Sequence, residues 1–209
     1  MLAEDPAILV SEFDAEIVGE PFRPNYNVAP TTLVPVVVVQ NQTRFIERVR
    51  WGIVPSWSAS KPMLLVNARG ESVAEKATFK KGFAGSRCLI PATGYYEWMR
   101  PAKEPYFISD PHHALLAMGG LIVPSTIDGQ KVPTCAIITV TAAPNIAEIH
   151  DRMPAMISRE MWSDWLDPGI GSDDALAMLH PTSGLRARAV SKRVNSVRNN
   201  DKHLLEPDQ

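Results

Sequence analysis

The stretch VPVVVVQNQTRFIERVRW, residues 34–51, decides the fold class, because it is typical of two β-strands joined by a short turn. Val34–Val39 is a run of β-branched side chains, which favour an extended backbone. Residues 41–42 turn the chain into a second run, Phe45–Trp51, that can pair with the first as a hairpin. Pro35 lacks a backbone donor, which indicates the start of a strand or a sheet edge. We therefore predict a β-hairpin at the centre of a strand-rich fold.

Outward from this hairpin, five more short stretches predict strands: Cys88–Ile90, Tyr95–Trp98, Tyr106–Ile108, Leu115–Val123 and Thr134–Val140. Three helices are predicted: an amphipathic one over Pro6–Phe13, one capped by Ser158 and one capped by Ser172. The 18 prolines interrupt helices and central strands, so we expect short segments joined by ordered loops. The prediction is a single domain over residues 1–209, mostly β, with peripheral helices.

Composition restricts the class of protein. At 209 residues, with 45% hydrophobic and 21% charged residues, the chain can bury a core and is too apolar for wholesale disorder. It begins without a signal peptide, and no apolar stretch approaches the roughly 18 residues of a membrane span. Cys88 and Cys135 give neither a disulfide framework nor a metal-ligand spacing. We expect a cytoplasmic protein in a reducing compartment, with no metal and no cofactor.

Two segments place a polar residue in apolar, turn-rich surroundings and so mark candidate chemistry. Asn27, within Tyr26–Pro30, can act in catalysis or merely satisfy backbone groups of its loop. Glu97 is flanked by aromatic side chains within Gly94–Trp98. A carboxyl group in such surroundings has a raised pKa and suits proton transfer near neutral pH, unless it faces water at a strand edge.

His150, within Ile149–Pro154, is the third candidate. A histidine ring titrates near roughly pH 6.5 and can both accept and donate a proton, although a lone histidine is more often structural. Asp151 and Arg152 beside it can fix the orientation of the ring or hold a phosphate.

A basic face is the fourth feature, and it must be local because the formal net charge is −2, which by itself argues mildly against DNA. Arginine binds phosphate well, and an exposed tryptophan such as Trp57 can stack on a base. Each such residue alone is more often a solvated charge or a core aromatic. The candidates are Arg69, Lys80, Lys81, Arg87, Arg152 and the arginines after Leu185.

Seven segments, in this order, resemble those of the SRAP family (SOS response-associated peptidase). They are Tyr26–Pro30, Arg50–Trp57, Asn67–Glu71, Arg87–Ala92, Gly94–Trp98, Ile149–Pro154 and Val194–Asn199. The resemblance runs from about Asn25 to Pro207, and seven collinear motifs are far more specific than one. It implies an α+β, mostly β fold with a curved, barrel-like sheet, a groove for single-stranded DNA and peripheral helices.

The resemblance also implies a function: members recognise abasic sites in single-stranded DNA and form a covalent thiazolidine cross-link through an N-terminal cysteine. A terminal α-amine, with a pKa near 8, attacks the aldehyde of the opened sugar, and the cysteine thiol closes the ring. By this resemblance Asn27 orients the N-terminal residue, Glu97 moves protons, and His150 protonates the sugar oxygen. Trp57, Asn67, Arg69 and Arg152 would hold flanking phosphates and bases. The expected partner is single-stranded DNA with abasic sites, bound by a monomer that is nucleoid-associated when on DNA.

This chain departs from the family pattern at its start. Members begin Met-Cys-Gly-Arg, whereas this chain begins Met1-Leu2-Ala3-Glu4. We favour a start that omits a short Cys-Gly-Arg segment; an engineered removal and a natural loss of the nucleophile are the alternatives. Two other functions follow from these possibilities: non-covalent binding of single-stranded DNA, and a peptidase that uses Glu97 and His150.

Overall fold

The computed structural model describes residues 1–58 and 63–207, and it confirms the predicted hairpin. The two strands are β2 (Leu33–Gln40) and β3 (Thr43–Trp51), paired antiparallel from Leu33–Arg50 to Gln40–Thr43. Residues 41 and 42 form the turn, and both have positive φ angles. Pro35 lies inside β2 rather than at its start. It is tolerated there because the pairing of β2 with its second neighbour is confined to Val37 and Leu89.

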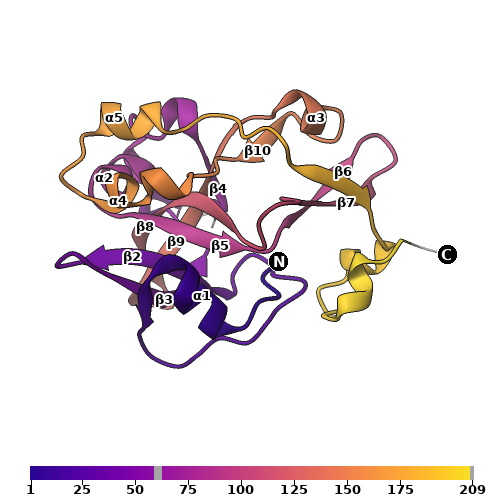
Figure 1. The fold of residues 1–209 in the computed structure, drawn as a ribbon. Helices are drawn as coiled ribbons and strands as arrows, with labels where there is room; N and C mark the ends of the chain where they lie inside the picture. The colour runs from indigo at the N-terminus through magenta and orange to yellow at the C-terminus, as the bar shows by residue number, and fades with distance from the viewer. Residues whose placement is uncertain (59–62, 208–209) are drawn as a thin grey trace.

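Within the described residues, five strands close into a barrel-like sheet (Figure 1). Starting from the hairpin, β2 pairs with β5 (Arg87–Ala92), β5 with β8 (Leu116–Ile127), and β8 with β9 (Gln130–Thr141). The start of β9 then pairs with the end of β3, through Arg50–Thr134 and Trp51–Cys135, and this contact closes the ring. The predicted α+β, mostly β class with a curved, barrel-like sheet is therefore confirmed.

A second sheet projects from the barrel and carries one of the predicted site residues. It consists of β6 (Tyr95–Met99), β7 (Glu104–Ser109) and β11 (Arg186–Ala189), all antiparallel, with β7 in the middle. In Figure 1, β6 and β7 extend away from the barrel, and the C-terminal segment lies beside them. Glu97 faces the same side of this sheet as Tyr95, as the alternation of the sequence predicts.

Three very short strands complete the main sheet. They are β1 (Ala15–Ile17), which lies parallel to β3, β4 (Asn67–Arg69), parallel to β9, and β10 (Arg152–Pro154), antiparallel to β9. Thr139 of β9 therefore has Arg69 as its register partner on one side and Pro154 on the other. This arrangement places two segments that are far apart in the sequence on the two sides of one strand.

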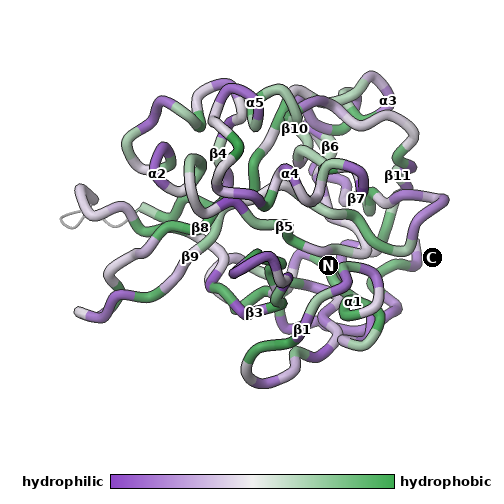
Figure 2. Tube along the Cα trace, turned by 60° about the vertical axis from the view of Figure 1, so that its left-hand side comes forward, coloured by the Kyte–Doolittle hydropathy of each residue, from purple (hydrophilic) through white to green (hydrophobic). Residues whose placement is uncertain are grey.

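Among the described residues, five helices lie around the two sheets. They are α1 (Pro6–Phe13), α2 (Ala77–Gly85), α3 (Pro144–Ala147), α4 (Trp162–Leu166) and α5 (Ser172–Ala177). α2 lies against β8 and α4 against β5, where the Trp165 indole donates to the carbonyl of Cys88 at 2.9 Å. Phe13 of α1 stacks on Trp162 at 4.5 Å between ring centroids. Figure 2 shows β5 mostly in the green of hydrophobic residues. No helix among these residues has the length and apolarity that a membrane span requires.

Both serine caps predicted for the later helices are wrong in detail. Ser158 holds the cap position of a short 3₁₀ turn before α4, but its side chain makes no capping hydrogen bond. Ser172 is the first residue of α5, and Gly171 holds the cap position. Asp173 and Asp174 do lie in the first turn of α5, where the helix dipole favours them.

Arg87 does not belong to a basic face, because it is 5% exposed. Its guanidinium donates to backbone carbonyls at the ends of α2 and α4, including Phe83 at 2.8 Å and Trp165 at 2.7 Å. Further carbonyl acceptors are Ala84, Asp167 and Ile170. Burial lowers the pKa of this guanidinium, and nearby Asp167 raises it. Arg87 is thus a structural residue that joins two helix ends to the barrel.

Candidate functional site

One end of the barrel opens into an apolar pocket of about 300 Å³, which we call the barrel-end pocket. All five barrel strands contribute to it, and β6 closes one side. The lining residues are Met1, Leu2, Asn27, Val28, Pro30, Val34, Pro35, Trp51, Ile90, Pro91, Ala92, Gly94, Tyr95, Tyr96, Trp98, Met118 and Ile137. The first residue of the chain enters this pocket: the Met1 nitrogen donates to the carbonyl of Gly94 at 3.0 Å. Burial lowers the pKa of the Met1 amine to about 5.

Glu97 lies on β6 between two residues that line this pocket, Tyr96 and Trp98, and it is within electrostatic range of His150. Burial raises the pKa of the Glu97 carboxyl, while the charge of His150 and the backbone N–H of Trp98 lower it; nearby Asp151 raises it. A carboxyl group that feels the charges of His150 and Asp151 lies within electrostatic reach of both, although they are more than fifty residues away in the sequence. A half-buried acid within electrostatic range of an imidazole can move protons near neutral pH.

The His150 ring is held through one of its nitrogens. The backbone N–H of Arg152 donates to Nδ1 at 3.0 Å, and the carboxylate of Asp151 lies 3.4 Å from the same atom. A neutral ring whose Nδ1 accepts a hydrogen bond carries its proton on Nε2. No hydrogen bond to Nε2 is found within residues 1–58 and 63–207. Nε2 is therefore the atom through which His150 can exchange a proton with a bound molecule.

Asn27 lines the barrel-end pocket, but its amide nitrogen is directed to the C-terminal segment. It donates to the carbonyls of Val194, Ser196 and Asn199, each at 3.1 Å. These bonds match the simpler possibility for Asn27, that it satisfies loop backbone groups, and they link it to neither Glu97 nor His150. Its catalytic role stays a prediction.

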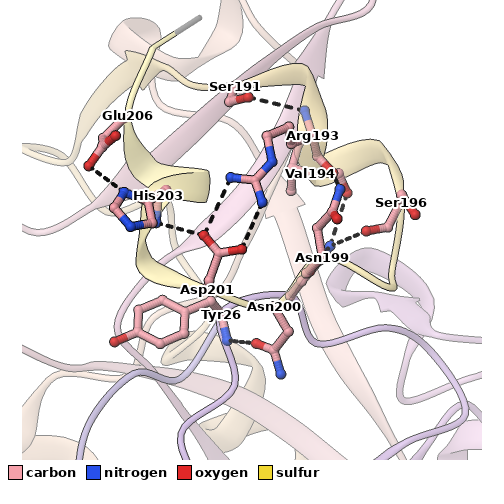
Figure 3. A network of polar contacts seen from close by, with 11 residues as sticks. Tyr26, Ser191, Arg193, Val194, Ser196, Asn199, Asn200, Asp201, His203 and Glu206 are labelled. Atoms are coloured by element: carbon pink, nitrogen blue, oxygen red, sulfur yellow. Dashed lines mark hydrogen bonds and ion pairs between the residues drawn. The ribbon is translucent and has the colours of Figure 1, made fainter.

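The C-terminal segment, residues 191–206, is fastened over this side of the molecule by a network of polar contacts (Figure 3). Arg193 pairs with Asp201 at 2.8 Å, and the side chain of Asn200 accepts the backbone N–H of Tyr26 at 2.7 Å. The Trp98 indole donates to the side chain of Asn195 at 2.7 Å. Two pocket residues, Asn27 and Trp98, therefore hold this segment, a connection that nothing in the local sequence of either residue reveals.

The residues predicted to contact DNA differ in their exposure. Asn67 and Arg69 are exposed on one face of β4, and the register partner of Asn67 is Ile137, which lines the pocket. Register partners share a face of the sheet, so Asn67 borders the pocket. Trp57 is 63% exposed, and its indole donates to Thr78 at 3.1 Å. These three side chains are available to a ligand.

Arg152 differs from them, because its side chain is only 18% exposed and is already paired. It forms a two-pronged ion pair with Glu71, in which Nη2 lies 2.9 Å from Oε2, and it also donates to the carbonyl of Thr139. The sequence patterns do not predict a role for Glu71. Its only signal is its place two residues after Arg69, in a motif otherwise interpreted through its asparagine and arginine.

The two thiols are not part of this site. Cys88 and Cys135 are fully buried in the barrel. Burial raises the pKa of the Cys88 thiol well above its usual value and that of Cys135 to about 12. Neither supplies a thiolate near neutral pH. Within the described residues, no group of three or more His, Cys, Asp and Glu side chains could hold a metal ion.

Comparisons with known proteins point to one family. The family described as "SOS response associated peptidase (SRAP)" matches residues 1–197. Abasic site processing protein YoaM of Bacillus subtilis is 33% identical over 212 residues, which cover 96% of this chain and 93% of that protein. Abasic site processing protein HMCES of Pongo abelii is 32% identical over 89% of this chain and 66% of its own length. A crystal structure from Bacteroides thetaiotaomicron superposes over the whole chain with a TM-score of 0.86, at 20% identity.

Proposed function

This chain belongs to the SOS response associated peptidase family, and we propose that it recognises abasic sites in single-stranded DNA as part of the DNA-damage response. The names of its relatives, abasic site processing proteins, support this substrate. The observation that carries the proposal is half-buried Glu97, which is flanked by two pocket residues and within electrostatic range of His150, beside a pocket that the Met1 nitrogen enters. An abasic sugar offers an aldehyde, and an amine with a neighbouring acid–base pair is the chemistry that captures aldehydes.

The proposed reaction starts with opening of the sugar. Protonated His150 gives the proton on Nε2 to the ring oxygen as the C1–O bond breaks, and Glu97 takes the proton of the C1 hydroxyl, which leaves the aldehyde. The amine nitrogen then bonds to the aldehyde carbon, loses two protons, and the carbonyl oxygen leaves as water. Glu97, whose pKa is raised by burial, accepts and returns protons in these steps. The product is an imine, and a thiol on the same N-terminal residue adds to it to form a thiazolidine.

The N-terminal residue decides how far this reaction proceeds. Because the pKa of the Met1 amine is lowered to about 5, the amine is neutral near pH 7 and nucleophilic. A neutral amine at this position can form the imine, and closure of the ring needs a thiol on the same residue. In a chain extended by Met-Cys-Gly-Arg-Phe, the cysteine would stand four residues before Met1, whose nitrogen lies in the wall of the same pocket. Asn27 would contribute by holding the pocket wall around that residue.

DNA would approach along the exposed face of β4. Arg69 is suited to a phosphate next to the lesion, Asn67 to the group that enters the pocket, and Trp57 to stacking with a neighbouring base. Arg152 is paired with Glu71, so it would bind a phosphate only by exchanging that partner. These contacts need no nucleophile, so they equally favour the second candidate function, non-covalent binding of single-stranded DNA.

The test is covalent capture. The chain that begins at Met1 and a chain extended by Met-Cys-Gly-Arg-Phe are incubated with single-stranded DNA that holds one abasic site, with and without borohydride. We expect the unextended chain to be trapped only with borohydride, which reduces an imine. The extended chain should give a species that survives denaturation without it. Glu97→Gln and His150→Gln should slow capture at least about 100-fold.

Glu75→Gln is the matched control, because Glu75 is exposed and is no part of the site. Its rate should equal that of the unmodified protein. If folded protein of neither form is captured under any condition, the cross-linking proposal is wrong. Salt-dependent binding without capture would then identify a non-covalent DNA-binding protein. Turnover of a labelled peptide that Glu97→Gln abolishes would instead identify a peptidase.

A further inference from the structure

Near the site, Arg152 and Glu71 form an ion pair through two hydrogen bonds. This pairing occupies the guanidinium that would otherwise bind a phosphate. Both terminal nitrogens of the guanidinium contact the two carboxylate oxygens of Glu71, and one also donates to the carbonyl of Thr139. The Arg152 side chain is 18% exposed, whereas that of Glu71 is 56% exposed. An arginine held in this way is anchored to the protein rather than presented to solvent.

The anchor joins the two segments that flank β9. Glu71 lies in the short 3₁₀ turn that follows β4, and Arg152 is the first residue of β10. Because β4 and β10 lie on opposite sides of β9, the ion pair crosses over that strand, and Thr139 of β9 accepts from the same guanidinium between them. The position of the start of β10 therefore depends on a carboxylate eighty-one residues away in the sequence.

The same residue, Arg152, also fixes His150. Its backbone N–H donates to Nδ1 at 3.0 Å, and its carbonyl oxygen lies 3.1 Å from that nitrogen. The N–H suits a ring whose Nδ1 accepts, and the carbonyl suits a ring whose Nδ1 carries a proton, as it does in the protonated ring. Both protonation states of His150 thus find a partner on one residue, provided that its backbone stays in place.

We propose that Glu71 is a positioning residue: by anchoring the Arg152 side chain, it holds the backbone that fixes Nδ1 of His150 and so leaves Nε2 for proton transfer. The role of Glu71 in the reaction rests on the proposed function, whereas its contacts with Arg152 do not. Arg152 is at the end of a three-residue strand, where backbone pairing alone constrains it least. Among the described residues, loss of Glu71 leaves the guanidinium with Thr139 as its only acceptor.

The experiment reads the hydrogen bond directly. In ¹⁵N-labelled protein at a pH where the His150 ring is neutral, the scalar coupling between the Arg152 amide nitrogen and Nδ1 reports the bond that joins them. We expect this coupling in the unmodified protein, a decrease of at least about twofold in Glu71→Gln, and an intermediate value in Glu71→Asp. Glu12→Gln is the matched control, because it breaks the Glu12–Arg159 pair of 3.0 Å elsewhere on the surface and should leave the coupling unchanged.

A full coupling in folded Glu71→Gln would overturn the inference. If that variant does not fold, Glu71→Asp decides the question: reduced coupling supports the inference and an unchanged value overturns it. In the chain extended by Met-Cys-Gly-Arg-Phe, Glu71→Gln should slow capture about tenfold and change the Kd for intact single-stranded DNA less than about twofold. Weaker DNA binding with an unchanged coupling would show that Glu71 acts on the DNA face instead, and would also overturn it. The coupling needs no DNA, so failure of the proposed function alone leaves it measurable.

Discussion

Replacement of Arg87 by methionine should be one of the most destabilising single changes in this protein. Arg87 is 5% exposed and donates to five backbone carbonyls from α2, α4 and the turn after α4. No carboxylate pairs with it in the described residues. Removal of a buried charged donor leaves its acceptors unsatisfied, which costs about 3–5 kcal/mol in comparable cases. The guanidinium also lies 5.9 Å from the Phe83 ring and 5.7 Å from the Trp165 ring, and these contacts are lost too.

The measurement is urea unfolding followed by tryptophan fluorescence. For a domain of this length, a loss of about 3–5 kcal/mol lowers Tm by roughly 6–20 °C and lowers the urea midpoint at an unchanged slope. Arg87→Lys should recover only part of the loss, since an ammonium cannot reach carbonyls on three segments at once.

Arg159→Met is the matched control. Arg159 also lies over a tryptophan, 5.5 Å from the Trp162 ring, and pairs with Glu12, but it is 63% exposed. Its loss should cost less than about 1 kcal/mol. If the two methionine variants unfold within about 1 kcal/mol of each other, the carbonyl network of Arg87 is not what stabilises this part of the fold.

Three further predictions concern the site. Burial raises the pKa of Glu97 above its ordinary 4.5, so its ionisation reduces stability as the pH rises through that range. Glu97→Gln should therefore unfold at no lower urea concentration than the unmodified protein at pH 7, although capture is lost; a clearly lower midpoint would contradict this. Asn27→Ala removes the amide that three carbonyls share and should cost about 1–3 kcal/mol. Amide exchange should then be faster in residues 194–199, and unchanged exchange there would refute the role of Asn27. Arg69→Gln should lower the slope of log K against log salt for single-stranded DNA by about 0.7, with Arg159→Gln showing no change.

The hairpin and the long strands could be predicted because their signal is local. Alternation and β-branched runs specify β2, β3, β5, β8 and β9 whatever they pair with. The short strands β4 and β10 have no such signal, since three residues become a strand only through pairing with β9. What specifies these short strands is therefore their contact with segments that are distant in the sequence.

α2 could not be predicted for a different reason. Its sequence includes Gly82 and Gly85, which lower the propensity for a helix. The packing explains Gly82: a Cβ at this position would lie 2.7 Å from the carbonyl oxygen of Ile122 on β8. A residue that weakens the helix in isolation is therefore required for its close approach to the sheet, and composition alone suggests a loop.

The site residues show the same division between local and distant information. The proximity of Glu97 and His150 could be predicted only through a family resemblance, because β6 and the segment after α3 meet by topology. The environments of Arg69, Arg87 and Arg152 could not be told apart from their neighbours in sequence. Arg69 is exposed, Arg87 donates to several backbone carbonyls, and Arg152 is paired with a carboxylate.

This distribution of arginines bears on how an abasic site would be selected. The net charge is −2, and of the basic residues proposed for DNA, Arg87 is buried and Arg152 is paired with Glu71. Arg193 near the pocket is likewise paired with Asp201. These residues are thus less available to phosphates, so the salt dependence of binding to intact single-stranded DNA should be smaller than the full set of candidate basic residues would give. Under the proposed function, discrimination must come mainly from the aldehyde, which only the lesion offers to the amine beside Glu97 and His150. A variant with stronger charge on the β4 face would therefore bind DNA more tightly but distinguish an abasic site from intact DNA less well.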